Sequence, residues 1–247
     1  MSLKNLRDAI AHKKALKVIS GLNNFDVANV VAVCRAAQLG GATFVDIAAD
    51  VEIIKAVKES IDLPVCVSAV EPQLFVSAVE AGADLIEIGN FDSFYAQGIN
   101  FSAEDVLSLT RQTRALLPHV LLSVTVPHTL PLDEQVELAQ KLEAEGADII
   151  QTEGGTSSNP NHSGILGLIE KASPTLAAAH AISRAVQIPV LCASGLSDVT
   201  VPMAIATGAS GVGVGSAVNK LNDQVAMIAV VRSLVEALNR SASQAVV

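Results

Sequence analysis

The sequence has few aromatic residues, no tryptophan, no basic run and no long hydrophobic run. Aromatic residues make up 3% of the 247 positions, and the formal net charge is −9. Nucleic-acid binding needs phosphate-neutralising cations or aromatic stacking platforms, so we expect no DNA or RNA partner. No apolar run reaches the roughly 18 residues of a membrane helix, and the amino-terminal segment lacks an apolar signal core. We therefore expect a cytoplasmic protein that does not bind membranes.

The cysteines are also too scattered to form a recognisable site. Cys66 and Cys192 lie in apolar runs typical of strands, which indicates small buried side chains rather than redox chemistry. Asp46, Glu87 and Glu153 could bind a hard cation together, but no histidine spacing supports zinc. No metal site is predicted.

What the sequence does contain is a repeat, a Gly-Ala pair followed by a short apolar run. The repeat spans 41–48, 82–89, 146–154 and 208–215, and it alternates with four further apolar segments at 17–22, 64–69, 121–126 and 189–195. With aromatics this scarce, the core must be filled by Ala, Val, Ile and Leu, which suits a parallel sheet covered by helices.

Helical patterns fill the gaps between these strand candidates. Asp26 is placed to cap one helix, Pro72 opens a second with Gly82 just past its end, and Gly146 follows a third. Eight strands alternating with about eight helices predict a single TIM barrel over residues 1–240, with a disordered tail at 241–247. A doubly wound open sheet is the alternative.

The repeat also predicts which side chains face inward. Strand side chains alternate between faces, so Asp46, Glu87, Gln151 and Glu153 share one face. The intervening residues, such as Val45, are apolar and are expected to face the helices. Charged side chains are rarely buried without partners, and several on one inward face therefore indicate a polar pocket near the carboxyl ends of the strands.

Glycines follow the last two strands, where barrels often bind phosphate. Backbone N–H groups there and a short helix expected at 217–221 could receive an anion, although glycines at strand ends also simply make turns. The predicted phosphate-binding residues are Ser194, Gly195, Gly213, Gly215 and Ser216.

Two other residues have open roles. Lys17 could be an inward amine, paired with Asp46 or Glu87 or serving in Schiff-base or proton-transfer chemistry; its place near the start of a strand favours instead a lysine that reaches solvent at the bottom rim. His128 follows the fifth strand, where an exposed loop histidine is favoured over a general acid or base. Ser20, Asn23 and Asn24 are expected ligand contacts.

Glu153 is the strongest catalytic candidate. It ends the sixth strand and precedes two glycines and a loop of about 20 residues, a length usually found in functional or disordered loops. The segment 164–172 could form a short helix within that loop and make it an ordered lid. A carboxylate beneath such a lid suits a general base; the alternative is a structural carboxylate that binds loop N–H groups.

The runs KVISGLNNFD, TEGGTS and CASGLSD, followed by GVGVGSAVNKL, resemble the conserved chloroplast reading-frame proteins of algal plastids and their cyanobacterial counterparts, classed as a domain of unknown function. The resemblance covers residues 1 to about 240. That family is similar to aldolase-type TIM barrels with phosphate sites, such as thiazole synthase and N-acetylmannosamine-6-phosphate epimerase. The resemblance implies cyanobacterial cytoplasm or plastid stroma, and it carries no established reaction.

Three functions remain open. The first is an isomerase or lyase that acts on a small phosphorylated metabolite, with Glu153 moving a proton and Lys17, Asp46 and Glu87 as further catalytic candidates. The second is a flavin mononucleotide (FMN) protein that uses the same phosphate site. The third is a non-catalytic ligand sensor or assembly protein, for which the apolar segment Val225 to Val231 could meet a second subunit.

Overall fold

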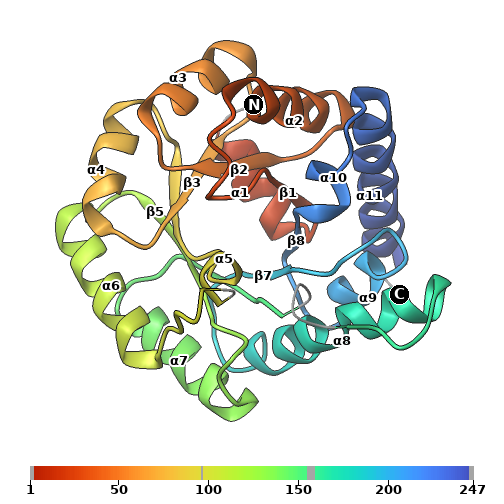
Figure 1. Ribbon diagram of the computed structural model, residues 1–247. Helices are drawn as coiled ribbons and strands as arrows, with labels where there is room; N and C mark the ends of the chain where they lie inside the picture. The colour runs from red at the N-terminus through yellow and green to blue at the C-terminus, as the bar shows by residue number, and fades with distance from the viewer. Residues whose placement is uncertain (1–2, 96, 155–158, 245–247) are drawn as a thin grey trace.

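The computed structural model describes residues 3–95, 97–154 and 159–244. In these residues eight parallel strands form a closed barrel in sequence order, and the last strand pairs with the first. The barrel is surrounded by helices (Figure 1). The strands are β1 (Ala15–Ile19), β2 (Phe44–Ala48), β3 (Val65–Ala69), β4 (Leu85–Ile88), β5 (Leu121–Thr125), β6 (Ile149–Gln151), β7 (Val190–Ala193) and β8 (Gly211–Val214). The TIM barrel is confirmed, and the open sheet is excluded because β1 and β8 close the ring.

The helices begin and end largely where the sequence predicts. Asp26 accepts a hydrogen bond from the Asn29 N–H at the start of α2, and Pro72 opens α4. The helices are α1 (Leu3–Ala11), α2 (Val27–Gly40), α3 (Val51–Ser60), α4 (Pro72–Glu80), α5 (Asp92–Tyr95), α6 (Ala103–Leu116), α7 (Leu132–Ala144), α8 (Gly164–Ile182), α9 (Val201–Ala206), α10 (Ser216–Asn219) and α11 (Gln224–Gln244). None of the described helices is long and apolar enough for a membrane crossing.

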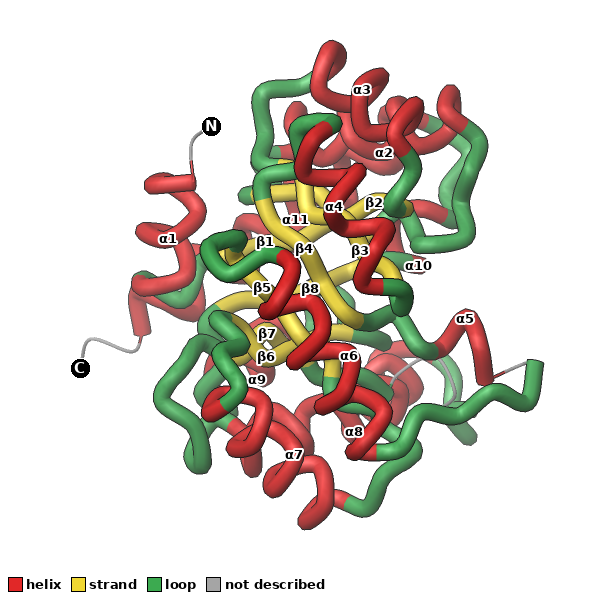
Figure 2. The backbone as a smooth tube through the Cα atoms, turned by 90° about the vertical axis from the view of Figure 1, so that its left-hand side faces the viewer, coloured by secondary structure: helices red, strands yellow, loops and turns green. Residues whose placement is uncertain are grey.

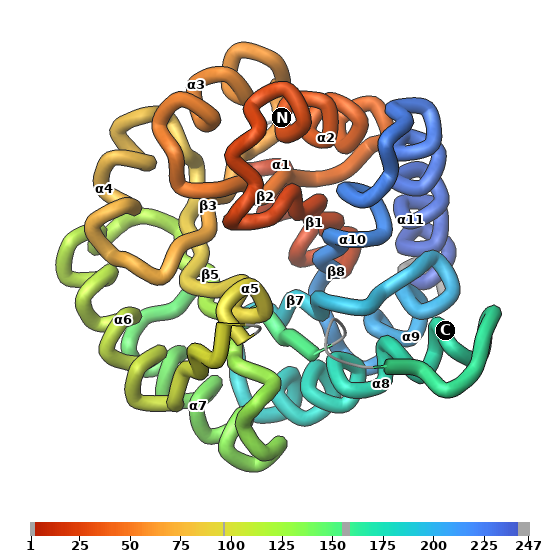
Figure 3. Tube along the Cα trace, in the orientation of Figure 1, coloured from red at the N-terminus to blue at the C-terminus, as the bar shows by residue number. Residues whose placement is uncertain are grey.

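Two helices differ from the prediction. The segment 164–172 is not a short helix inside a loop, because it forms the first turns of the 19-residue α8. The last helix, α11, extends to Gln244, so residues 241–244 of the expected disordered tail belong to this helix. Residues 245–247 lie outside the described residues. Figure 3 shows α11 lying beside α2, with which it makes extensive contacts, so the last helix closes the helix layer against the helix that follows β1.

The barrel interior changes character along its axis. At the amino-terminal end, Leu6 and Ile10 of α1 pack against inward side chains of the strands, including Phe44 and Leu85. The side view places α1 at this end and α5 at the opposite end (Figure 2). The outward residues, such as Val45, pack with the helices in a second cluster, as the alternation predicts. In the described residues, α1 thus closes the amino-terminal end of the barrel with apolar side chains.

Candidate active site at the barrel mouth

A buried ion cluster lies above the apolar layer. Lys17 Nζ lies 2.7 Å from Glu87 Oε2 and 3.2 Å from Asp46 Oδ2, and all three side chains are at most 1% exposed. Burial alone would lower the pKa of Lys17, but attraction by Glu87 and Asp46 outweighs it and raises that pKa. Lys17 therefore lies in a buried ion cluster with two carboxylates. Burial raises the pKa of Glu87 despite the attraction of Lys17.

Polar side chains from neighbouring strands complete the cluster. Gln151 Nε2 donates to Glu87 Oε1 at 2.7 Å, and the Ser123 hydroxyl donates to Glu87 Oε2 at 2.7 Å. On the other carboxylate, Ser68 Oγ donates to Asp46 Oδ1 at 2.7 Å and Asn90 Nδ2 donates to Asp46 Oδ2 at 3.3 Å. Buried charges need such donors. The amides of Gln151 and Asn90 thus link the ion cluster to the space above it.

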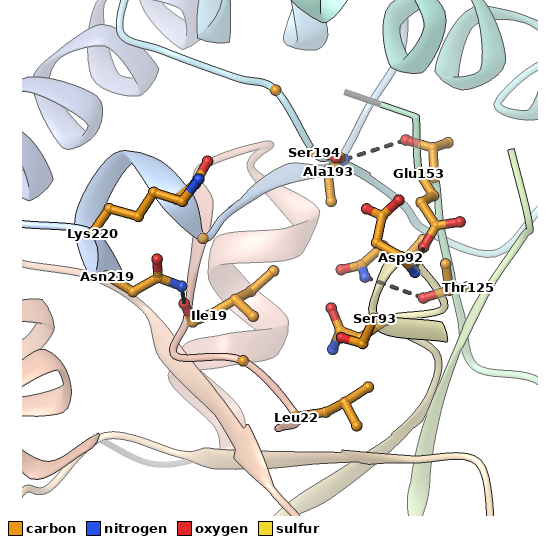
Figure 4. A pocket seen from close by; sticks show the side chains of 17 residues that line it. Ile19, Leu22, Asp92, Ser93, Thr125, Glu153, Ala193, Ser194, Asn219 and Lys220 are labelled. Carbon is orange, nitrogen blue, oxygen red and sulfur yellow. Dashed lines mark hydrogen bonds between the residues drawn. The ribbon is translucent and has the colours of Figure 1, made fainter. Parts of the chain in front are cut away.

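That space is a pocket of about 240 Å³ at the carboxyl ends of the strands. Figure 4 shows Asn219 and Lys220 on one side of the pocket and Asp92 and Glu153 on the opposite side. Its lining comprises Ile19, Gly21, Leu22, Asn90, Asp92, Ser93, Thr125, Gln151, Thr152, Glu153, Ala193, Ser194, Gly195, Gly215, Ser216, Asn219 and Lys220. A cationic side chain and a carboxylate thus face each other across a small cavity.

Glu153 is held in place by donors from two loops. Its Oε2 accepts from the Tyr95 hydroxyl at 2.8 Å and contacts His128 Nδ1 at 3.0 Å, and its Oε1 accepts from the Asp92 N–H at 3.2 Å. Its side chain is 4% exposed. The hydrogen bond to Glu153 raises the pKa of His128, against a smaller effect of burial. Glu153 and His128 therefore form a pair that shares a proton-binding site beside the pocket.

The loops after β7 and β8 form the other side. Ser194 and Gly195 both have positive φ angles, 78° and 71°, which a serine seldom adopts. Gly215 precedes α10, which begins one residue earlier than expected. Asn219 Nδ2 donates to the Ile19 carbonyl at 3.1 Å and so joins α10 to the end of β1. Strained backbone of this kind clusters at ligand sites.

Two groups of side chains could supply metal ligands. Asp46, Cys66 and Glu87 have ligand atoms within 4.8 Å of one another, as do Asp92, His128 and Glu153. In the first group the Lys17 ammonium already contacts both carboxylates. All three cysteines are buried and none forms a disulfide, as the sequence indicates. Burial raises the pKa of the Cys192 thiol to about 11.

Residues 1–244 match the model of a protein family described as "Protein of unknown function (DUF561)". The chain belongs to this family. It is 48% identical to the uncharacterized protein ycf23 of Cyanophora paradoxa over 94% of this chain and 96% of that one. It is 39% identical to the ycf23 protein of Pyropia yezoensis over 91% of this chain and 82% of that one.

Solved structures with a similar fold share less sequence with this family member. Thiamine phosphate pyrophosphorylase from Pyrococcus furiosus has a TM-score of 0.61 and 20% identity over 97% of this chain and 99% of that one. A 3-hexulose-6-phosphate synthase has a TM-score of 0.64 and 16% identity over 90% and 99%. The (S)-3-O-geranylgeranylglyceryl phosphate synthase of Thermoplasma acidophilum was solved with sn-glycerol-1-phosphate. It has a TM-score of 0.62 and 16% identity over 95% of this chain and 98% of that one. These similarities agree with the TIM-barrel fold.

The structure changes the interpretation of several predicted site residues. Lys17 does not reach solvent at the bottom rim, because it lies in the middle of β1 and points into the ion cluster. His128 is not an exposed loop histidine, since its side chain is 16% exposed and contacts Glu153. Ser20 is buried but does not line the pocket, because Ile19 takes the inward position. Asn23 is exposed and also lies outside the lining.

The loop after Glu153 is described only in part. Gly154 has a φ of 143°, which favours glycine and turns the chain away from β6. Residues 155–158, where the predicted lid begins, lie outside the described residues. Sequence reasoning missed Asn90, Asp92 and Tyr95, which directly follow β4. Applying the same strand-end rule to β4 as to β7 and β8 would have found them.

Proposed function

We propose that the protein is an enzyme of the isomerase or lyase type that binds a small phosphorylated metabolite at the barrel mouth. One observation carries the proposal: a single small pocket is lined by the carboxylate of Glu153 and, on the other side, by Ser194, Gly195, Gly215 and Ser216. The phosphate group would contact these loops and the Lys220 ammonium. The reacting carbon would then lie beside Glu153.

Proton transfer is the chemistry that Glu153 suits best. Its Oε2 is engaged by Tyr95 and His128, whereas among the described residues Oε1 accepts only from the Asp92 N–H. A carboxylate oxygen can accept a further donor or abstract a proton from a substrate within hydrogen-bond reach. His128 supplies a second proton-binding group, because the hydrogen bond to Glu153 raises the pKa of His128.

The ion cluster has a supporting role in this proposal. Lys17, Asp46 and Glu87 do not line the pocket, and the raised pKa of Lys17 opposes Schiff-base formation. We assign them to orienting the amides of Gln151 and Asn90 rather than to contact with the ligand.

The fold neighbours support the phosphate part of the proposal. Their names refer to thiamine phosphate and hexulose 6-phosphate compounds, and one was solved with sn-glycerol-1-phosphate. A pocket of about 240 Å³ is below the range of about 300–1,000 Å³ for drug-sized ligands, so it suits a small metabolite better than FMN. Location in cyanobacterial cytoplasm or plastid stroma, and a homo-oligomer through the exposed Val225 region of α11, stay predictions.

A thermal-shift screen of phosphorylated metabolites would identify ligands, since molecules that bind only the folded state raise the melting temperature. For each hit, exchange of substrate hydrogen with solvent deuterium, followed by proton NMR, would report proton transfer. Glu153→Gln should slow this exchange by about 10²–10⁴-fold.

A matched control is available on α8. Glu170 also contacts a histidine, His162, but neither residue lines the pocket. Glu170→Gln should leave the exchange unchanged. Hits that raise the melting temperature without exchange would instead favour the ligand-sensor function, and equal exchange by Glu153→Gln would remove Glu153 from the mechanism.

A further inference from the structure

Gln151 presents a buried carbonyl oxygen without a hydrogen-bond donor. The residue is 2% exposed, and among the described residues nothing donates to its Oε1. Its Nε2 donates to Glu87 Oε1 at 2.7 Å and to Thr125 Oγ1 at 3.2 Å. A buried polar atom left without a partner costs free energy. Gln151 lines the pocket, where a ligand can supply the missing donor.

The orientation of this amide is fixed by its charged neighbour. Exchanging its oxygen and nitrogen would place the amide oxygen 2.7 Å from the Glu87 carboxylate oxygen, where two acceptors repel each other. Glu87 also accepts from Lys17 and Ser123, so it binds donors at both oxygens. The ion cluster therefore turns the NH₂ group of Gln151 downward and leaves its carbonyl for the pocket.

The oxygen lies toward the β8 side of the pocket floor. A Cβ atom added at Gly213 would lie 3.4 Å from Gln151 Oε1, so the glycine keeps the space in front of the oxygen open. Asn90 repeats the arrangement: its Nδ2 donates to the Asp46 carboxylate, and it lines the same pocket. Two amides are thus held by two buried carboxylates.

We infer that the ligand carries hydroxyl groups as well as its phosphate, and that Gln151 Oε1 accepts a hydrogen bond from the innermost hydroxyl. The inference rests on the proposed function, because it assigns the phosphate to the loops after β7 and β8. An amide oxygen only accepts hydrogen bonds, so the group opposite it must be a donor. A phosphorylated polyol or sugar meets this requirement, and a purely keto or alkyl chain does not.

Titration calorimetry with ribitol 5-phosphate, pentyl phosphate and inorganic phosphate tests this inference. The first two share a five-carbon chain and differ in their hydroxyl groups. Gln151→Met keeps the side-chain length but removes the acceptor, and should weaken ribitol 5-phosphate about five- to tenfold while leaving pentyl phosphate unchanged. Gln135→Met is the control, because Gln135 is also a buried glutamine but donates to the Leu130 carbonyl away from the pocket.

A second variant guards against misfolding of the first. Gly213→Ala would put a methyl group 3.4 Å from Gln151 Oε1 but also 2.9 Å from Ala193 Cβ, so it is combined with Ala193→Gly, which removes that clash. Compared with Ala193→Gly alone, the double variant should weaken ribitol 5-phosphate selectively. If phosphate and both organic probes bind but neither variant discriminates between them, the hydroxyl inference is overturned and the phosphate site stands. If no phosphate compound binds the wild-type protein, the proposed function fails and the inference fails with it.

Discussion

Lys17 Nζ and Glu87 Oε2 lie 2.7 Å apart inside the barrel, and both side chains are fully buried. Asp46 shares the same ammonium at 3.2 Å. Two carboxylates and one ammonium leave a negative excess, and donors such as Gln151 and Ser123 offset part of it. The cluster therefore depends on Lys17 for its stability, and the pocket above depends on the cluster for the orientation of its amides.

Lys17→Met should lower the free energy of unfolding by about 3–5 kcal/mol, because it leaves two buried carboxylates without their counter-charge. Urea unfolding followed by circular dichroism measures the loss. Lys58→Met is the comparison, since the pair of Lys58 with Asp84 is partly exposed and should contribute less than about 1 kcal/mol. A Lys17→Met protein of full stability that had lost activity would contradict the supporting role and point to direct catalysis.

Leu6→Ala tests the closure of the barrel by α1. Leu6 is 0% exposed and packs on the inward side chains at the amino-terminal end, so its truncation should cost about 2–5 kcal/mol. Leu3→Ala on the same helix removes a side chain that is 36% exposed and should cost less than about 0.5 kcal/mol. The two variants should bind ligands with unchanged affinity, because the pocket lies at the opposite end. Equal stability losses would mean that α1 does not close the barrel.

Gly89→Ala tests the close approach between Gly89 and Thr125. An added Cβ would lie 2.7 Å from Thr125 Cβ and closer still to Thr125 Oγ1, which accepts from Gln151. Such overpacking should cost about 1–3 kcal/mol. The double variant Gly89→Ala with Thr125→Ala should recover part of the loss, since it removes Thr125 Oγ1, the nearest atom in the contact. No recovery would place the cost in the backbone rather than in this side-chain clash.

The fold could be predicted because its evidence is local. Each Gly-Ala pair with its apolar run lies within one segment, and the alternation places Asp46 and Glu87 on the inward face without any knowledge of distant contacts. The role of α1 could not be predicted in this way. Its partners, such as Phe44 and Leu85, come one from each of several strands, and only the closed barrel brings them together.

The sequence predicts which side chains lie at the barrel mouth, but not which of them contact one another. The sequence places Glu153 and Gly215 at the mouth, and the structure brings them to one pocket. The sequence could not show that Lys17 lies mid-strand beside Glu87. That contact spans 70 residues and depends on the stagger between β1 and β4. The burial of His128 likewise depends on Tyr95, which lies far from it in the sequence. The two rings pack edge-on, with their centroids 5.0 Å apart.

The pair of His128 with Glu153 should make stability depend on pH. The hydrogen bond to Glu153 raises the pKa of His128 above its ordinary value of 6.5, so the folded state binds the proton more tightly than the unfolded state. The stabilisation is therefore fully present below pH 6.5 and is lost as pH rises through the higher folded-state pKa. The stability difference between wild type and His128→Gln, measured by urea unfolding, should therefore shrink as the pH rises above 6.5. Histidine NMR titration provides the control: Glu153→Gln should lower the His128 midpoint, and an unchanged midpoint would show that another group holds the proton.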